Sequence, residues 1–427
     1  MIGGKTVYAE LARDIAGRIS AQDAGDLTYE MVRIPSVTGD EGVAADFYAG
    51  LLRGLGLETR LQYVEPGRPN VIGRLQGQGG GENLLLYGHL DTIPWTGCVP
   101  PRRDPEVVWG RGAADVKGSL VAMVLAAKAL MAAGAPLKGD LYLTASVGHE
   151  IPWPLHPTLG HGDGAKLLAQ AIHSGELPAD YCVIAEGPAD GIFVVQGALT
   201  PWRITLRGGA GAVHTSTTTL DHSPVTWLGD LLADLYAYNE EIQRRGVYPL
   251  IGIPPRLEIG LITGGDYFNR NPSEATAIGA IRWDPGWTAE RAEAEFRERL
   301  AAARARLARK YKDDSIEIGL FFRTGKEACD TREHPRTGQL IEHLRAAARP
   351  LLGIDLAPSG ARAATDLEIF CRQGGVATVA FGPGVIPSGP TTGGRPGGAH
   401  ANDEGVSVPA LVQLAGVYAA LALRVCG

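Results

Sequence analysis

At 427 residues the chain is long enough for two or three domains, each with its own buried core. Acidic residues outnumber basic ones by 47 to 40, which argues against a nucleic-acid partner or a polybasic membrane surface. The five scattered cysteines form no Cys-x-x-Cys pair and indicate free thiols in a reducing compartment. Neither a signal-peptide core nor an apolar run of spanning length is visible, so we expect a soluble, cytoplasmic protein without a membrane partner.

The first half of the chain alternates between helix-like and strand-like patterns. An N-terminal helix pattern occurs around residues 9–19, and an Ala-rich helix is expected at 118–133. Short apolar runs at 83–87, 141–147 and 181–185 are typical of strands buried on both faces. Strands of this kind with helices between them predict a mostly parallel sheet in an α/β domain.

The middle of the chain has a different pattern, beginning with polar and apolar residues that alternate as in a half-exposed antiparallel strand. The expected order is strand, helix, strand, strand, helix, strand, at residues 202–207, 224–244, 256–262, 274–283, 288–310 and 315–321. This order is typical of a ferredoxin-like α+β unit.

The first pattern then resumes, with a helix, an apolar strand and a closing helix at residues 338–352, 376–381 and 409–424. We therefore predict one catalytic α/β domain, formed by residues 1–198 and 324–427, that is interrupted by an inserted domain at 199–323. A Gly/Pro/Thr-rich stretch at 387–398 is expected to be a loop near the functional site.

Histidines and acids recur at the ends of the expected strands or in the loops after them. They lie in five short segments: Tyr-Gly-His-Leu-Asp at 87–91, Gly-Arg-Gly-Ala-Ala-Asp at 110–115, Gly-His-Glu at 148–150, Ala-Glu-Gly-Pro at 185–188 and Gly-Ala-His at 398–400. Taken singly, each has an ordinary structural explanation, such as a helix cap for Asp115 or a loop acid for Glu186. Together they place imidazole and carboxylate ligands at the edge where open α/β sheets bind. Such ligands suit catalytic Zn, Co or Mn, and one shared carboxylate would give a two-metal centre.

With these segments the chain resembles, over nearly its whole length, the superfamily of zinc-dependent aminoacylases, acetylornithine deacetylases, succinyl-diaminopimelate desuccinylases and glutamate carboxypeptidases. Stretches at 208–214, 264–272, 280–282 and 381–384 are similar as well. The resemblance implies a zinc-peptidase-like catalytic domain with an inserted ferredoxin-like lid that forms a homodimer. It also implies a non-Pro cis peptide after Asp115.

The resemblance further implies a role for each matching residue. Asp115 would bridge two divalent metal ions, most often zinc. One ion would be completed by His89 and Glu186, and the other by Glu150 and His400. Asp91 would support the catalytic groups beside the metals. In the lid, His214 would stabilise the oxyanion across the dimer interface, and the substrate would contact Asn269, Arg282 and Gly360, of which Arg282 suits a carboxylate.

The third segment departs from the family, which has two adjacent acids where this chain has His149 and Glu150. His149 could replace the usual acid as the general base. Alternatively, Glu150 is the base and the ligand comes from another residue of this region, namely His149, His156, His161 or Asp163. A third possibility is a non-hydrolytic protein that binds metal or an acylated amino acid.

We expect a metal-dependent amidohydrolase that cleaves an N-acyl amino acid or a small peptide-like substrate, with His149 as the base. The proline-rich stretch at 151–157 is expected to line or cover the pocket, with Trp153 as a candidate apolar wall. No Gly-x-Ser-x-Gly motif supports a serine hydrolase.

Overall fold

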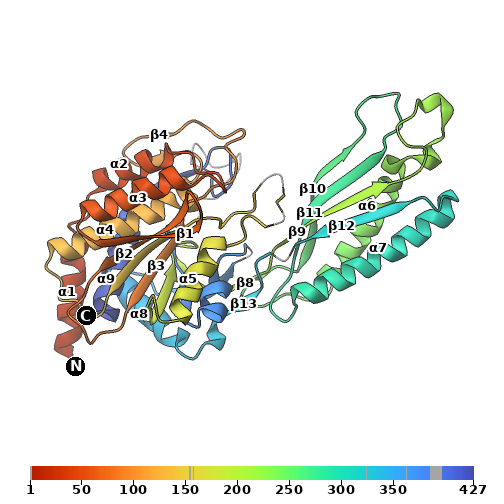
Figure 1. Cartoon of the computed structure of the whole chain (residues 1–427). Coiled ribbons are helices and arrows are strands. Elements are labelled where there is room, and N and C mark those ends of the chain that lie inside the picture. The colour runs from red at the N-terminus through yellow and green to blue at the C-terminus, as the bar shows by residue number, and fades with distance from the viewer. Residues whose placement is uncertain (1, 153–154, 157, 324, 362, 385–396) are drawn as a thin grey trace. The chain divides into compact units, whose positions relative to one another are not determined.

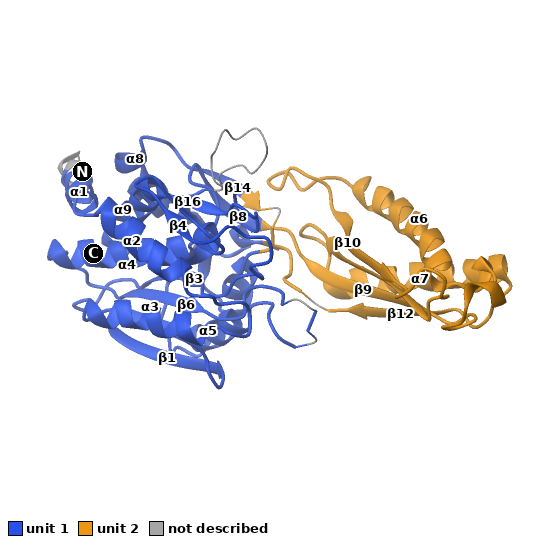
Figure 2. Cartoon of the chain, turned by 90° about the horizontal axis from the view of Figure 1, so that it is seen from above, with its two compact units in different colours: residues 1–195, 330–359, 365–427 blue, residues 196–329, 360–364 orange. Residues whose placement is uncertain are grey.

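The structure, a computed structural model, describes residues 2–152, 155–156, 158–323, 325–361, 363–384 and 397–427 (Figure 1). Trp153 and all but the last two residues of the 387–398 stretch lie outside these ranges. The chain forms two compact units, coloured separately in Figure 2. Unit 1 contains Met1–Val195, Asp330–Ser359 and Thr365–Gly427, and unit 2 contains Gln196–Cys329 and Gly360–Ala364. The corresponding boundaries expected from the sequence are 198/199 and 323/324.

A nine-stranded sheet forms the centre of unit 1. Its strands are β1 (Glu58–Glu65), β2 (Arg68–Leu75), β3 (Leu84–His89), β6 (Leu141–Ser146), β7 (Tyr181–Ile184), β8 (Gly191–Gln196), β13 (Cys329–Asp330), β14 (Ala357–Ala361) and β15 (Ala377–Ala380). The spatial order is β1-β2-β6-β3-β7-β15-β8-β13, and β14 pairs with β8. The neighbours β6, β3, β7 and β15 are parallel, which confirms the predicted sheet. Every residue of these four strands is buried, as expected for strands covered on both faces.

Helices cover both faces of this sheet (Figure 1). They are α1 (Ile2–Ala16), α2 (Ala21–Val32), α3 (Gly42–Gly54), α4 (Gly118–Ala132), α5 (Asp163–His173), α8 (Thr337–Leu352) and α9 (Val408–Val425), with short turns η1 (Ala113–Lys117), η4 (Thr331–Glu333) and η5 (Ile369–Gln373). α5 and η5 share one core with β3, β6 and β7. The Ala-rich α4 packs against α9 and β3. A Cβ at Gly88 would lie 2.8 Å from Leu120 Cδ2, so glycine permits this close approach of helix and strand.

The second helix and a small sheet are among the elements of unit 1 that the sequence does not predict. The N-terminal helix pattern belongs to α1, which ends at Ala16, and a second helix, α2, begins after Ser20, whose hydroxyl caps the N–H of Asp23 at 3.1 Å. A small sheet of β4 (Arg102–Arg103), β5 (Val107–Trp109) and β16 (Gly405–Ser407) is additional. Among the described residues, α9 is the one helix long and apolar enough to cross a membrane, and 72% of it is buried in the structure, as in a core helix.

Unit 2 is a four-stranded antiparallel sheet with two helices. Its elements are β9 (Thr200–Arg207), η2 (Thr215–Thr217), η3 (Leu220–His222), α6 (Pro224–Gln243), β10 (Arg256–Gly264), β11 (Glu274–Arg282), α7 (Ala289–Tyr311) and β12 (Glu317–Phe322). The order β10-β11-β9-β12 is that of a ferredoxin-like sheet, as the sequence predicts. Trp202, Trp227 and Phe296 lie in its core, so unit 2 has apolar packing of its own.

Candidate metal centre

Three candidate ligands lie at one edge of the unit 1 sheet. His89 is the last residue of β3, Glu150 lies four residues after β6, and Glu186 lies two residues after β7. Since these three strands are parallel neighbours, their carboxyl ends meet at the same edge. Asp115 reaches this edge from η1, between β5 and α4, and His400 from the segment before β16. These five residues are called the ligand cluster below.

The carboxylate of Asp115 faces both histidines of the cluster. Its Oδ1 lies 3.1 Å from His89 Nε2, and its Oδ2 lies 3.4 Å from His400 Nε2. His89 Nε2 is also 3.7 Å from Glu186 Oε1, whereas His400 Nε2 is 2.8 Å from Glu150 Oε1. Each half of the cluster therefore contains one histidine, one glutamate and one oxygen of Asp115, which is the arrangement expected of a bridging carboxylate.

The carboxylates raise the pKa values of the two histidines. Burial lowers the pKa of His89, but the hydrogen bond to Asp115 and nearby negative charges outweigh it and raise that pKa to about 10. Burial also lowers the pKa of His400, and its contacts with Asp115 and Glu150 raise it to about 11, although water partly screens this half-exposed ring. Burial raises the pKa of Asp115, yet the two histidines hold it well below its ordinary value. Protons thus balance charge that divalent cations would otherwise balance.

The donor set fits divalent metal ions. Its atoms are imidazole nitrogens and carboxylate oxygens, which suit catalytic zinc, cobalt or manganese. His89 Nδ1 lies 2.9 Å from the backbone oxygen of Asp91, which leaves Nε2 directed at the cluster, the usual arrangement of a metal-binding histidine. The ligand atoms of His89, Asp115 and Glu150 lie within 4.8 Å of one another, and so do those of His89, His149 and Glu186.

Buried acids hold the backbone of the turn that carries His149 and Glu150. The N–H of His149 donates to Asp91 Oδ1 at 3.0 Å, and the N–H of Glu150 donates to Asp91 Oδ2 at 2.8 Å. The N–H of Gly148 donates to Glu41 Oε1 at 3.1 Å, and Glu41 is in turn bound by Arg68 at 2.8 Å. The carboxylate of Asp91 thus positions the neighbouring turn, while its backbone oxygen positions His89. The sequence analysis does not identify Glu41 or Arg68.

The side chain of His149 is also held from two sides. Its ring stacks on that of His89, with centroids 3.9 Å apart and planes 2° apart. Its Nδ1 lies 2.7 Å from Oδ2 of the fully buried Asp366, which also accepts a hydrogen bond from Tyr87. The sequence analysis misses Asp366, because it lies 217 residues from His149 and is not part of a strand-end motif.

A second buried pair supports the segment that carries Asp115. Arg111 Nη1 donates to Glu404 Oε2 at 2.6 Å. Glu404 Oε1 accepts the N–H groups of Ala114 and Asp115 at 3.1 and 3.2 Å. The Asp115–Val116 peptide is cis. Glu404, four residues after His400, therefore positions Asp115 through its backbone.

The residues that the resemblance assigns to the oxyanion and the substrate all lie in unit 2, including Gly360, which the predicted boundaries place in the catalytic domain. His214 and Asn269 come together, with Nε2 and Nδ2 3.3 Å apart on the exposed surface. Arg282, on β11, donates to Glu258 Oε2 at 3.1 Å. A Cβ at Gly360 would lie 2.7 Å from the backbone oxygen of Leu250, so glycine permits close backbone packing there. The structure thus joins His214 with Asn269 and leaves Arg282 in an ion pair.

Of the residues weighed as alternative ligands, His149 belongs to a candidate metal-binding group, whereas His156, His161 and Asp163 have other contacts in the described structure. Nδ1 of the exposed His156 accepts the N–H of Leu159 at 3.0 Å, and Asp163 accepts the N–H of Gly160 at 2.7 Å. His161 is buried and has a positive φ of 68°. Within the described part of the chain, the groups able to hold a metal include His149 and Glu150 but none of these three.

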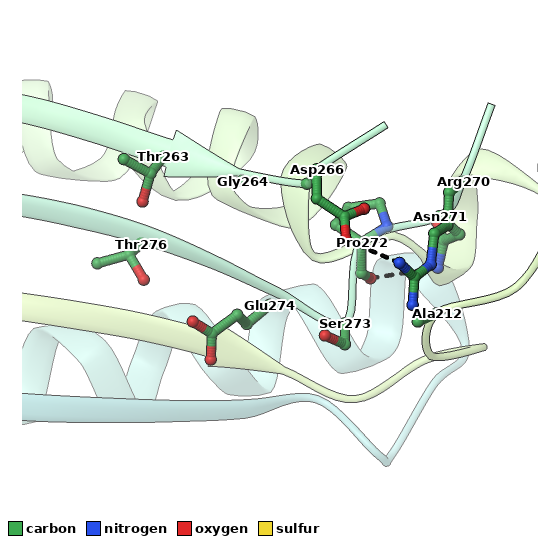
Figure 3. A pocket seen from close by; sticks show the side chains of 11 residues that line it. Ala212, Thr263, Gly264, Asp266, Arg270, Asn271, Pro272, Ser273, Glu274 and Thr276 are labelled. Atoms are coloured by element: carbon green, nitrogen blue, oxygen red, sulfur yellow. Dashed lines mark hydrogen bonds and ion pairs between the residues drawn. The ribbon is translucent and has the colours of Figure 1, made fainter. Parts of the chain in front are cut away.

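Unit 2 also contains a polar hollow of about 240 Å³ beyond the end of β10 (Figure 3). Asp266, Arg270, Asn271 and Glu274 are among its polar side chains, and Arg270 pairs with Asp266 at 2.7 Å. None of its lining residues belongs to the ligand cluster.

The α/β fold with its inserted lid and the clustered nitrogen and oxygen ligands define a metal-dependent hydrolase of the amidohydrolase and metallopeptidase class. A family model for the peptidase family M20/M25/M40 matches residues 85–424. The chain belongs to this family.

Several relatives and solved structures are similar to the chain. A succinyl-diaminopimelate desuccinylase of Methylocella silvestris is 30% identical over 67% of this chain and 74% of its own length. That of Methylobacterium nodulans is 32% identical over 65% and 70%. The dipeptidase Dug1p of Saccharomyces cerevisiae matches with a TM-score of 0.77, 14% identity and coverage of 97% and 98%. The Bacillus subtilis YXEP protein, described as a dinuclear metal-binding peptidase, matches at 0.60 with 13% identity and coverage of 95% and 98%. These two structures are evidence for the fold alone.

Proposed function

We propose that the chain is a two-metal hydrolase that cleaves the amide bond of an N-acyl amino acid or a small peptide-like substrate. The observation that carries this proposal is Asp115, whose two carboxylate oxygens face His89 and His400 at 3.1 and 3.4 Å. The names of the similar desuccinylases state that these enzymes remove a succinyl group. Substrates whose acyl group ends in a carboxylate are therefore the first class to test.

In this proposal Asp115 would be shared between two ions, His89 and Glu186 would hold one of them, and Glu150 and His400 would hold the other. Zinc is the expected metal, since mixed imidazole and carboxylate ligands are typical of catalytic zinc sites. Two bound ions supply polarisation of the substrate carbonyl and a lowered pKa for water. Asp91 contributes by fixing the backbone of residues 149 and 150.

His149 is proposed as the proton shuttle in place of the family's first acid. A neutral imidazole accepts a proton through one nitrogen, and with Nδ1 held by Asp366 that nitrogen would be Nε2. The stacking on His89 supports the role, because it holds the ring beside the ligand cluster. The proton accepted from water would then pass to the departing amine.

His214 is proposed to stabilise the oxyanion, while Asn269, Arg282 and Gly360 contact the substrate. We also propose that unit 2 mediates a homodimer and that the protein acts in the cytoplasm. The edge strand β10 supports the dimer, because Leu261 and Ile262 expose apolar side chains there, 39% and 49% accessible. The buried thiols of Cys182, Cys329, Cys371 and Cys426 support a reducing compartment.

The proposal is tested by assaying zinc-loaded protein on N-succinyl and N-acetyl amino acids and dipeptides, with metal content measured in parallel. Wild type should turn over at least one class, and Asp115→Ala should lose both metal and turnover. His149→Ala should keep its metal and lose about 10²- to 10⁴-fold in kcat.

Other outcomes would contradict parts of the proposal. If His149→Ala keeps its rate while Glu150→Ala loses it with metal content intact, Glu150 is the base. If the wild type binds metal but shows no turnover across the panel, the chain is a binding protein on this fold.

A further inference from the structure

We infer that Asp366 is a positioning residue that fixes the ring orientation and the tautomer of His149. The inference rests on the proposed function, since His149 is the proposed proton shuttle. It concerns a residue outside the ligand cluster and outside the five strand-end segments.

Asp366 is fully buried and is tied to the strands that carry the site. Its Oδ2 accepts hydrogen bonds from Tyr87 Oη, on β3, and from His149 Nδ1 at 2.7 Å. Tyr87 Oη also lies 2.7 Å from Ser146 Oγ, at the end of β6. Because the hydroxyl proton of Tyr87 is donated to Asp366, the Ser146 hydroxyl must donate to Tyr87. The hydrogen bonds therefore run from Ser146 through Tyr87 and Asp366 to the imidazole of His149.

These contacts distinguish the two nitrogens of the ring. An ionised carboxylate only accepts hydrogen bonds, so the His149 nitrogen that faces Asp366 carries a proton. In a neutral imidazole the other nitrogen, Nε2, then presents a lone pair. The stacked His89 fixes the plane of the ring, and Asp366 fixes which edge of it faces the sheet. A shuttle held in this way needs no rotation before it accepts a proton.

Asp366→Asn tests the inference because the amide keeps the size of the side chain but can donate to Nδ1 and so favour the other tautomer. We expect kcat to fall about 10- to 100-fold, with KM within about twofold and zinc content unchanged. A purely structural role would lower thermal stability or metal content together with the rate.

A second measurement depends neither on activity nor on the folding of Asp366→Asn. In metal-free wild type labelled with ¹⁵N-histidine, a long-range ¹H–¹⁵N spectrum should show His149 with its proton on Nδ1. The signal is assigned by its loss in His149→Gln. A wild-type spectrum with the proton on Nε2 would overturn the inference.

Asp313→Asn is the matched control. Asp313 forms an equivalent pair with His222 Nδ1 at 2.8 Å, in unit 2 and outside the proposed site, so this variant should keep wild-type kcat. If Asp366→Asn also keeps the wild-type kcat while His149→Ala loses it, the positioning role of Asp366 is contradicted and His149 remains the proposed proton shuttle. If His149→Ala keeps its rate, the shuttle fails, and the tautomer in wild type still decides whether Asp366 positions the ring.

Discussion

At the scale of single residues, protons on the histidines of the ligand cluster balance the charge of its carboxylates in the absence of metal. A raised pKa of about 10 for His89 and about 11 for His400 means that both rings are protonated near pH 7. Metal ligation needs neutral imidazoles, so binding must release these protons. As the pH rises toward 10, fewer protons compete, and the apparent affinity for zinc should increase.

Titration calorimetry measures this release when zinc is added at pH 7 in two buffers of different ionisation enthalpy. The apparent binding enthalpy should differ between the buffers in proportion to about two protons released per chain. His214→Gln serves as a control, because His214 lies outside the ligand cluster. An enthalpy that is the same in both buffers would contradict the protonated state of His89 and His400.

The pair of Arg68 and Glu41 stabilises the turn that carries His149. Both side chains are nearly inaccessible, and Glu41 also accepts the N–H of Gly148. Arg68→Ala would leave a buried carboxylate without its cation and should cost about 3–5 kcal/mol of unfolding free energy. Arg60→Ala, which breaks the exposed pair with Glu176, should cost about 0–1 kcal/mol. Denaturant unfolding compares the two, and equal costs would contradict the role of burial.

The residue types of the ligand cluster could be read from the sequence because each follows an expected strand or turn. The supporting residues could not. Asp366 reaches His149 across 217 residues, and Glu41 reaches Gly148 across 107, so neither contact leaves a local pattern. The partner of Arg282 was equally hidden, because Glu258 lies on the neighbouring strand of the folded sheet.

At the scale of elements, parallel strand order gathers the site. The buried runs that became β3, β6, β7 and β15 are visible in the sequence because most of their residues are apolar or small. The small sheet of β4, β5 and β16 was not visible, since strands of two or three residues are too short to show a period. α2 was missed for another reason: its polar cap Ser20 lies only four residues after α1 ends.

The packing of α5 against the end of β6 can be tested with two glycines in helices. A Cβ at Gly164 would lie 2.6 Å from the backbone oxygen of Val147, just before the turn that carries His149. Gly164→Ala should therefore destabilise the protein by about 1–3 kcal/mol. Gly50→Ala in α3 meets nothing within 4 Å and should stabilise it by up to about 1 kcal/mol. Effects of the same sign in thermal unfolding would contradict this packing.

At the scale of the whole molecule, the ferredoxin-like topology of unit 2 follows from its order of strands and helices, which the sequence shows. Oligomeric state does not follow from that order, because it depends on which apolar edge another chain covers. Sedimentation equilibrium should give twice the 45.0 kDa chain mass for wild type, and Ile262→Glu on the edge strand β10 should shift it toward the monomer. Lys310→Glu on α7 is the control on another surface of unit 2. A wild type that stays at 45.0 kDa at all concentrations would contradict the proposed dimer.

The central claim is that Asp115 bridges two metal ions beside a non-ligand His149. Anomalous diffraction from zinc-loaded crystals, recorded at the zinc edge, tests it most directly. We expect two peaks about 3.5–4 Å apart, one bound by His89 and Glu186 and the other by Glu150 and His400, with Asp115 shared between them. A single peak, or a peak within bonding distance of His149, would contradict the account.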